Sequence, residues 1–276
     1  MDEFRATFSE LVELGFFTQG LLLPNGWEVI RHVLDKETGN DLGEDVVLTI
    51  LEQGTLFLEY AGPDELDHFA AALVLLAERM ETPLTLFAKA GLCCPLAALL
   101  ECELSENVTL DLLTLFRILL EDCQIVEYCN AESLTGTLLD ILDLFSDKGV
   151  RIPATTLECI TLLLPLVKLS DDASLQIFEL FGHFFKKDAM LYVATLRAFK
   201  VLIAEHPVCS SLFTPTGFVD VLSELLLDEI ELIRRKAAKL LTFLSERQYL
   251  EFPNKKLQDT MVQVNQKRKK QNVTLS

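Results

Sequence analysis

The amino-acid sequence predicts an all-α protein built from repeated helical units. Half of the 276 residues are hydrophobic, whereas the chain holds only 12 glycines and 9 prolines. Such scarcity of turn residues disfavours a β protein with many tight turns. Apolar residues recur at i, i+3, i+4 and i+7, which is the periodicity of helices that bury one face. These helices also recur in pairs along the chain, which indicates stacked units.

Residues 1–43 are expected to form an N-terminal helical cap. The run Glu3–Leu14 places apolar side chains on one helical face, and Trp27–Leu34 does so again over a shorter length. Pro24, Asn25 and Gly26 form a turn signal between them. The following stretch to Gly43 is polar and rich in turn residues, so we expect a loop there.

Residues 44–252 are expected to carry the repeated units. Ser105 is a candidate N-cap for a long helix from Asn107, because its hydroxyl can accept from the first free backbone N–H groups. Pro165 should kink or end the helix that contains it. The predicted helices span residues 44–60, 65–80, 91–101, 107–123, 132–145, 153–169, 172–185 and 189–205, and a helical pair occupies 217–245.

The last helix of that pair resembles the third helix of an armadillo repeat. The resemblance rests on Ile233, Ala237, Leu240, Leu241 and Leu244, and helices beginning near residues 107, 153 and 189 follow the same pattern less closely. It implies an armadillo/HEAT-like right-handed α-solenoid of about five units. A helical bundle without a true repeat is the alternative.

The same register aligns four residues at equivalent positions, spaced 44, 39 and 42 residues apart, within the armadillo/HEAT range. Importin-type members of the family place a tryptophan there and an asparagine four residues later, and clamp an extended peptide between them. Here the first position holds Thr114, Glu158, Arg197 and Lys239, and the second holds Ile118, Leu162, Val201 and Phe243. The ladder is absent, which disfavours a nuclear import receptor. The resemblance still makes Thr114, Glu158, Arg197 and Lys239 candidate partner-binding residues, with an ordinary solvated helix face as the alternative.

The net charge of −18 is unevenly distributed. The C-terminal residues 253–276 hold six Lys and Arg residues against one Asp, so the remaining body is even more acidic than the whole chain. An acidic body repels nucleic acid and anionic membranes, and we expect neither as a direct partner. It suits proteins with basic segments, or it simply confers solubility. No apolar run approaches the roughly 18 residues of a membrane span.

The basic tail, residues 253–276, matches a bipartite nuclear localisation pattern, with two clusters separated by ten residues. Its basic residues would reach acidic pockets of an import adaptor. The alternatives are a solubilising end or a segment that docks on the acidic body. The tail therefore predicts a nuclear or cytoplasmic protein, and the residues involved are Lys255, Lys256, Lys267, Arg268, Lys269 and Lys270.

The sequence predicts no catalytic residue, cofactor or metal site. The start Met1-Asp2-Glu3 lacks the positive charge of a signal peptide, so the seven cysteines are expected as reduced core residues. They form no C-x-x-C pair, the four histidines are scattered, and common catalytic motifs are missing. The predicted function is a non-catalytic protein-interaction scaffold or adaptor, expected in a nuclear assembly. The alternatives are a cytosolic chaperone cofactor or assembly factor, an enzyme with an unrecognised site, and a piece of a longer solenoid.

Overall fold

The structure, a computed structural model, is helical in every regular element of its described residues. These residues are 11, 15–16, 20–22, 25–36, 43–79, 84–186, 189–213 and 216–249. The all-α prediction is confirmed over these ranges. Most of the helix predicted over residues 3–14 and the whole basic tail lie outside them. The chain divides into two compact units, residues 1–142 and 143–276.

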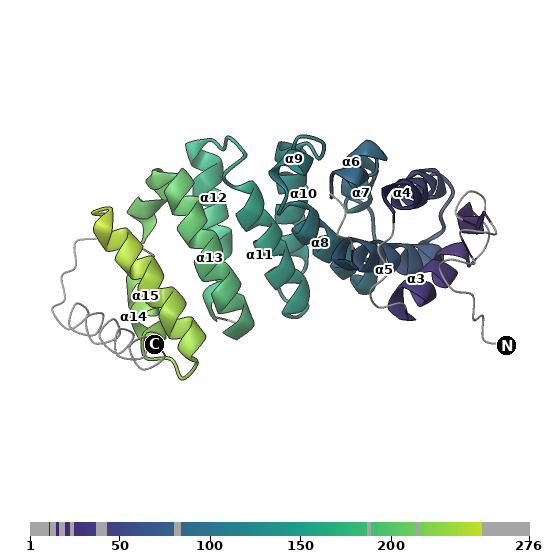
Figure 1. The fold of residues 1–276 in the computed structure, drawn as a ribbon. Coiled ribbons are helices and arrows are strands. Elements are labelled where there is room, and N and C mark those ends of the chain that lie inside the picture. The colour runs from purple at the N-terminus through teal and green to yellow at the C-terminus, as the bar shows by residue number, and fades with distance from the viewer. Residues whose placement is uncertain are drawn as a thin grey trace, which may run out of the picture. The chain divides into compact units, whose positions relative to one another are not determined.

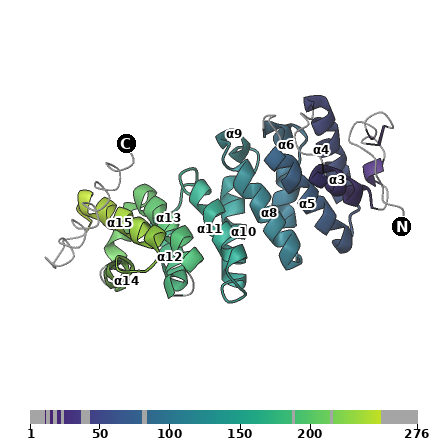
Figure 2. The same cartoon turned by 60° about the horizontal axis from the view of Figure 1, so that its bottom comes forward.

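The first unit holds two layers of helices (Figures 1 and 2). In one layer α3, α5 and α8 lie side by side, and in the other α4 packs against α6 and η1, and α6 packs against α9. The elements of this unit are η1 (Gly20–Leu22), α3 (Gly26–Lys36), α4 (Glu44–Leu58), α5 (Pro63–Arg79), α6 (Thr85–Lys89), α7 (Cys93–Leu99), α8 (Glu106–Leu119), α9 (Cys123–Val126) and α10 (Ala131–Leu144), whose last two residues belong to the second unit.

Three aromatic rings form the centre of the first unit. Trp27 of α3 is only 3% exposed, and its ring meets Phe69 of α5 edge-on at 4.6 Å and Phe57 of α4 at 5.7 Å. A Cβ on Gly54 would lie 3.2 Å from the ring of Phe69, so α4 approaches this cluster closely at a residue without a side chain. The tryptophan of the predicted cap is therefore part of the same core as α4 and α5.

The second unit repeats the two-layer arrangement. Helices α11, α13 and α15 form a row in which each packs against the next, while α12 packs against α13 and η3, and α14 packs against α15 (Figure 1). The elements of this unit are α11 (Arg151–Leu163), α12 (Asp171–Gly182), η2 (His183–Lys186), α13 (Ala189–Glu205), η3 (Pro207–Leu212), α14 (Phe218–Leu225) and α15 (Glu231–Glu246).

A cluster of phenylalanines joins the two layers of this second unit. Phe199 of α13 lies 4.8 Å from Phe178 of α12 and 5.3 Å from Phe218 of α14, and Phe213 completes the group. Most of these pairs are edge-to-face, an arrangement that adds to the free energy of simple burial. Gly182 ends α12 against Phe218.

Local capping sets several helix boundaries. Ser105 accepts a hydrogen bond from the Val108 backbone N–H at 3.3 Å, which confirms the predicted N-cap of α8. The prediction of one helix over residues 107–123 is wrong at its C-terminal end, because α8 stops at Leu119. The Asp122 carboxylate accepts from the Gln124 N–H at 3.0 Å and starts the short helix α9 instead. Helix α11 ends at Leu163, just before Pro165, as predicted.

Candidate functional site

The four register positions, Thr114, Glu158, Arg197 and Lys239, differ in the unit that holds them and in how exposed they are. Thr114 lies on α8 in the first unit, half-buried, and donates its hydroxyl hydrogen to the Leu110 carbonyl oxygen of the same helix at 2.8 Å. The other three lie in the second unit. Glu158 on α11 is half-buried, whereas Arg197 on α13 and Lys239 on α15 are exposed.

Helical spacing explains why neighbouring cations share the face of Arg197 and Lys239. On α13, Ala198, Phe199 and Leu202 are buried, which leaves Arg197 and Lys200, three residues apart, on the exposed side. On α15 the buried residues include Ala237, Leu240, Leu241 and Leu244, which leaves Lys236, Lys239 and Phe243 as a stripe at helical spacing. Because α13 and α15 pack side by side, the two stripes adjoin.

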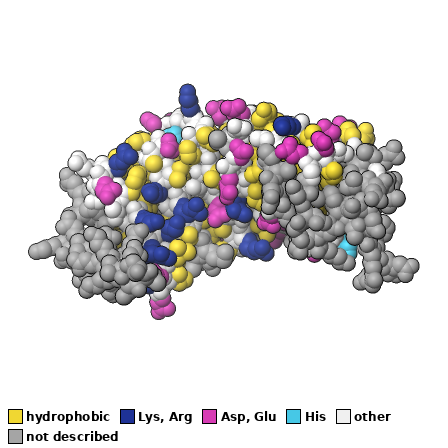
Figure 3. Space-filling model, viewed as in Figure 1, with side chains coloured by type: hydrophobic (Ala, Val, Ile, Leu, Met, Phe, Trp, Pro, Cys, Tyr) yellow, Lys and Arg dark blue, Asp and Glu magenta, His cyan; other side chains and the backbone are white. Residues whose placement is uncertain are grey.

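These residues form a basic cluster, which we define as Arg197, Lys200, Lys236 and Lys239. Partial burial and then the nearby charges of Arg197, Lys239, Lys200 and Arg235 lower the pKa of Lys236. Figure 3 shows Lys and Arg side chains gathered over α13 and the adjacent helices. The face is therefore locally basic, although the chain as a whole carries a charge of −18.

Two further arginines of α15 have local partners. Arg235 forms an ion pair with Glu231 one turn earlier, at 3.5 Å. Arg234 donates to the backbone carbonyl oxygens of Asp228 and Glu229, and so holds the turn between α14 and α15. By contrast, among the described residues none of the four cluster cations lies within 4.0 Å of a carboxylate oxygen.

Phe243 is an aromatic surface beside the cluster. The Lys200 Nζ and the Arg247 guanidinium carbon each lie 5.7 Å from the centre of its ring. Such cation–π contacts hold long cationic side chains over the ring face. Phe243 occupies the position at which an importin-type repeat has asparagine, so the row carries an aromatic and cationic surface where that class carries an amide.

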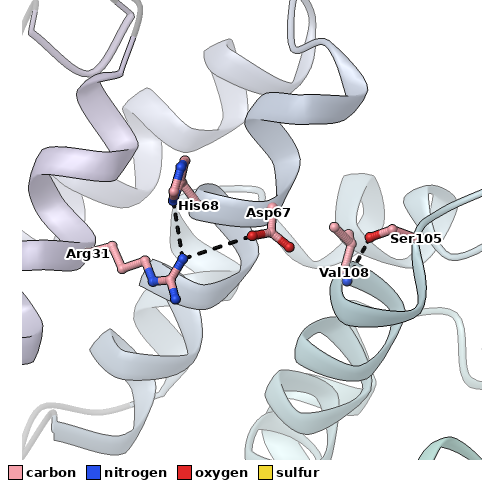
Figure 4. Close-up of polar contacts among 5 residues, drawn as sticks. All are labelled: Arg31, Asp67, His68, Ser105 and Val108. Atoms are coloured by element: carbon pink, nitrogen blue, oxygen red, sulfur yellow. Dashed lines mark hydrogen bonds and ion pairs between the residues drawn. The ribbon is translucent and has the colours of Figure 1, made fainter.

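The polar face of the first unit is different in kind. Arg31 on α3 donates to Nδ1 of His68 on α5 at 3.2 Å, and its guanidinium lies 3.9 Å from the Asp67 carboxylate (Figure 4). Here an arginine of α3 pairs with an aspartate of α5 across two packed helices. The same figure shows the Ser105 cap of α8.

The cysteines give no metal site among the described residues, where no group of three or more His, Cys, Asp or Glu side chains converges. The prediction that they are core residues holds for Cys93, Cys129, Cys159 and Cys209 but is wrong for Cys94 and Cys102, which are exposed. Cys94 lies in the first turn of α7, and Cys102 lies in the bend that follows this helix.

Two of the buried thiols, Cys129 and Cys209, are held in their neutral form. A hydrogen bond with Cys93 and burial raise the pKa of Cys129. Burial, followed by the charge of Asp171, raises the pKa of Cys209 to about 11, and the Cys209 thiol donates to the Ser174 carbonyl oxygen at 3.3 Å. Neutral, hydrogen-bonded thiols in a core are poor nucleophiles.

Comparison with known proteins identifies the fold. No protein-family model and no curated protein sequence matches the chain. Solved structures do match. A computationally designed armadillo repeat protein for modular peptide recognition superposes with a TM-score of 0.65 at 14% identity, over 79% of this chain and 92% of the other.

Two further structures agree with it. A designed armadillo repeat protein in complex with the peptide (KR)4 gives a TM-score of 0.62 at 14% identity, over 84% of this chain and 99% of that one. An engineered protein superposes with a TM-score of 0.67 at 15% identity, over 94% of this chain and 65% of the other chain. The predicted armadillo-like α-solenoid is confirmed, and a bundle without repeats is not supported.

The repeat register singles out Arg197 and Lys239 but not Lys200 and Lys236. The signal was present, because each lies three residues from a register position and so on the same helical face. The strongly acidic composition of the whole chain conceals a local cluster of the opposite sign.

Within the described residues, no helix is both long and apolar enough to cross a membrane.

Proposed function

We propose that this armadillo-like chain is a non-catalytic protein-interaction scaffold, and that the exposed face of the α11–α13–α15 row binds a partner protein. The observation that carries the proposal is the row itself, in which three successive helices pack side by side and α13 and α15 expose adjoining cationic and aromatic side chains. The similarity to designed repeat proteins made for peptide recognition supports this use of the fold.

The physical basis is additive contact along the row. Each helix of a repeat array offers a few side chains at fixed spacing, so an elongated partner gains one set of contacts for each helix that it crosses. Most of the binding free energy in such an interface comes from a few anchors, of which arginine and aromatic residues are common examples. Arg197 and Phe243 have the required chemistry and exposure.

Site-specific photocrosslinking tests this proposal. A photoreactive amino acid at Lys239 on the row should capture partner proteins, whereas the same group at Glu179, an exposed residue of α12 in the other layer, should not. Each position is exposed, so neither replacement should disturb folding. Equal recovery of the same proteins from both positions would show that the row is not the binding face.

The scaffold is further proposed to act in a nuclear assembly, with import directed by the basic tail. This rests on the spacing of the two basic clusters in the sequence, and the import adaptor would contact Lys255, Lys256 and Lys267 to Lys270. A fluorescent fusion should enter the nucleus, and alanine at residues 267–270 should keep it in the cytoplasm. An identical distribution of both fusions would contradict the nuclear role.

A further inference from the structure

We propose that the basic cluster of Arg197, Lys200, Lys236 and Lys239 binds an acidic peptide segment of the partner protein, with an apolar side chain of that segment beside Phe243. The inference rests on the proposed function, and it specifies the chemistry of the partner at the α13–α15 part of the row.

The first argument is unbalanced charge. Four cations lie on two packed helices, and among the described residues none has a carboxylate within ion-pair distance. Glu158 is half-buried on α11, one helix further along the row. The positive charges of Arg197, Lys239 and Lys200 repel Lys236, and carboxylates that approach from outside offset this repulsion. Carboxylates of a partner therefore gain more binding free energy at this cluster than they would beside an isolated lysine.

The second argument is the shape of the segment that fits. Packed helices lie about 8–10 Å apart, and an extended chain advances about 3.3 Å per residue. A segment that crosses from α13 to α15 therefore passes over both with roughly three residues. This favours acidic side chains about three positions apart, with an apolar side chain between them beside Phe243, over whose ring Lys200 and Arg247 lie.

The third argument separates a peptide from nucleic acid. A nucleic-acid strand carries a negative charge on every nucleotide and extends well past four cations. It would therefore meet the rest of a chain whose net charge is −18, which repels it. A short acidic peptide concentrates a few charges on the cluster alone. The basic tail of the chain has the wrong sign to occupy the cluster.

Fluorescence anisotropy tests the proposal with defined probes. The first probe is a fluorescein-labelled peptide with two Asp-Glu pairs flanking one Phe, and the second replaces the acids by Asn and Gln. The intact chain should bind the acidic peptide with an affinity that falls as salt rises, and should bind the amide peptide at least roughly tenfold more weakly.

Matched variants locate the site. Replacing three exposed cluster residues by glutamine should weaken binding of the acidic peptide by roughly tenfold or more. The control variant replaces three exposed cations of the same unit that are not among the charges acting on Lys236. Both variants therefore lose three positive charges. The control variant should bind the acidic peptide as tightly as the intact chain does. The cluster variant is Arg197→Gln/Lys200→Gln/Lys239→Gln, and the control is Lys148→Gln/Arg151→Gln/Lys168→Gln.

Circular dichroism checks that both variants fold. If the triple cluster variant does not fold, the single variant Lys239→Glu replaces it and should also bind the acidic peptide more weakly. Equal weakening in the cluster and control variants would overturn the proposal, because it would reveal only a response to net charge. Tighter binding of a single-stranded oligonucleotide of equal charge would overturn it in favour of nucleic acid. If the acidic peptide fails to bind while crosslinking at Lys239 still captures proteins, the acidic-peptide inference fails and the scaffold proposal stands.

Discussion

Gly182 and Gly136 should respond with opposite signs to the same substitution by alanine. Gly136 lies within α10, and a Cβ placed on it would meet no heavy atom within 4 Å apart from its chain neighbours and the backbone of its own helix. Gly182 ends α12, and a Cβ on it would lie 2.5 Å from Cζ of Phe218. Ordinary carbon contacts begin near 3.4 Å, so the ring would have to move by about 0.9 Å.

That movement is opposed by the phenylalanine cluster. The ring of Phe218 already lies 5.3 Å from Phe178 and 5.3 Å from Phe199, and both of these are fully buried. Overpacking of this kind costs about 1–3 kcal/mol. Alanine also gains about 0.5–1 kcal/mol of helix propensity over glycine. At Gly182 this gain offsets only part of the overpacking cost, whereas at Gly136 there is no such cost.

Urea unfolding followed by far-ultraviolet circular dichroism measures both effects. With a slope of about 2 kcal/mol per molar urea, Gly182→Ala should lower the midpoint by up to about 1.2 M, and Gly136→Ala should raise it by about 0.3 M. In the Gly182→Ala background, Phe218→Leu should cost less than in the original chain, because leucine lacks the obstructing Cζ. Shifts of the same sign for the two alanines, or strictly additive effects in the double variant, would refute this reasoning.

Three further results are expected. Ser105→Ala removes the acceptor for the Val108 N–H and should lower the free energy of unfolding by about 1 kcal/mol, while Ser105→Asp should retain it. The folded-state pKa of Cys209 is raised to about 11 from 9.0, so its contribution to stability should be complete below pH 9.0 and lost as pH rises to about 11. A Cys209→Ala chain should lack that part of the pH dependence, which urea midpoints across this range would reveal. Thiol alkylation of the native chain should modify Cys94 and Cys102 and leave Cys209 unmodified, as peptide mass spectrometry would show.

The fold was largely predictable because its determinants are local. Apolar residues at helical spacing mark each helix, and residues such as Ser105 and Pro165 mark an end. The break between α8 and α9 was missed, because the apolar pattern continues through it. The sequence signal for the break is Asp122, whose carboxylate accepts a hydrogen bond from the backbone N–H two residues later.

The candidate site was less predictable, because it depends on contacts across distant parts of the chain. The repeat register aligns Arg197 with Lys239 but says nothing about the charge that surrounds them. The packing of α13 on α15 adds Lys200 and Lys236 and brings Lys200 over the ring of Phe243. Net charge, a property of the whole chain, conceals such a local excess of the opposite sign.

Chemical-shift mapping by nuclear magnetic resonance tests the binding face most directly. Titration with the acidic peptide should shift backbone amide signals of α13 and α15 most strongly, centred on Arg197, Lys200 and Lys239. Signals of α12 and α14, which form the other layer of the same unit, should move little. The largest shifts in α12 or α14, or no saturable shift in α13 and α15, would contradict the assignment of the row as the binding face.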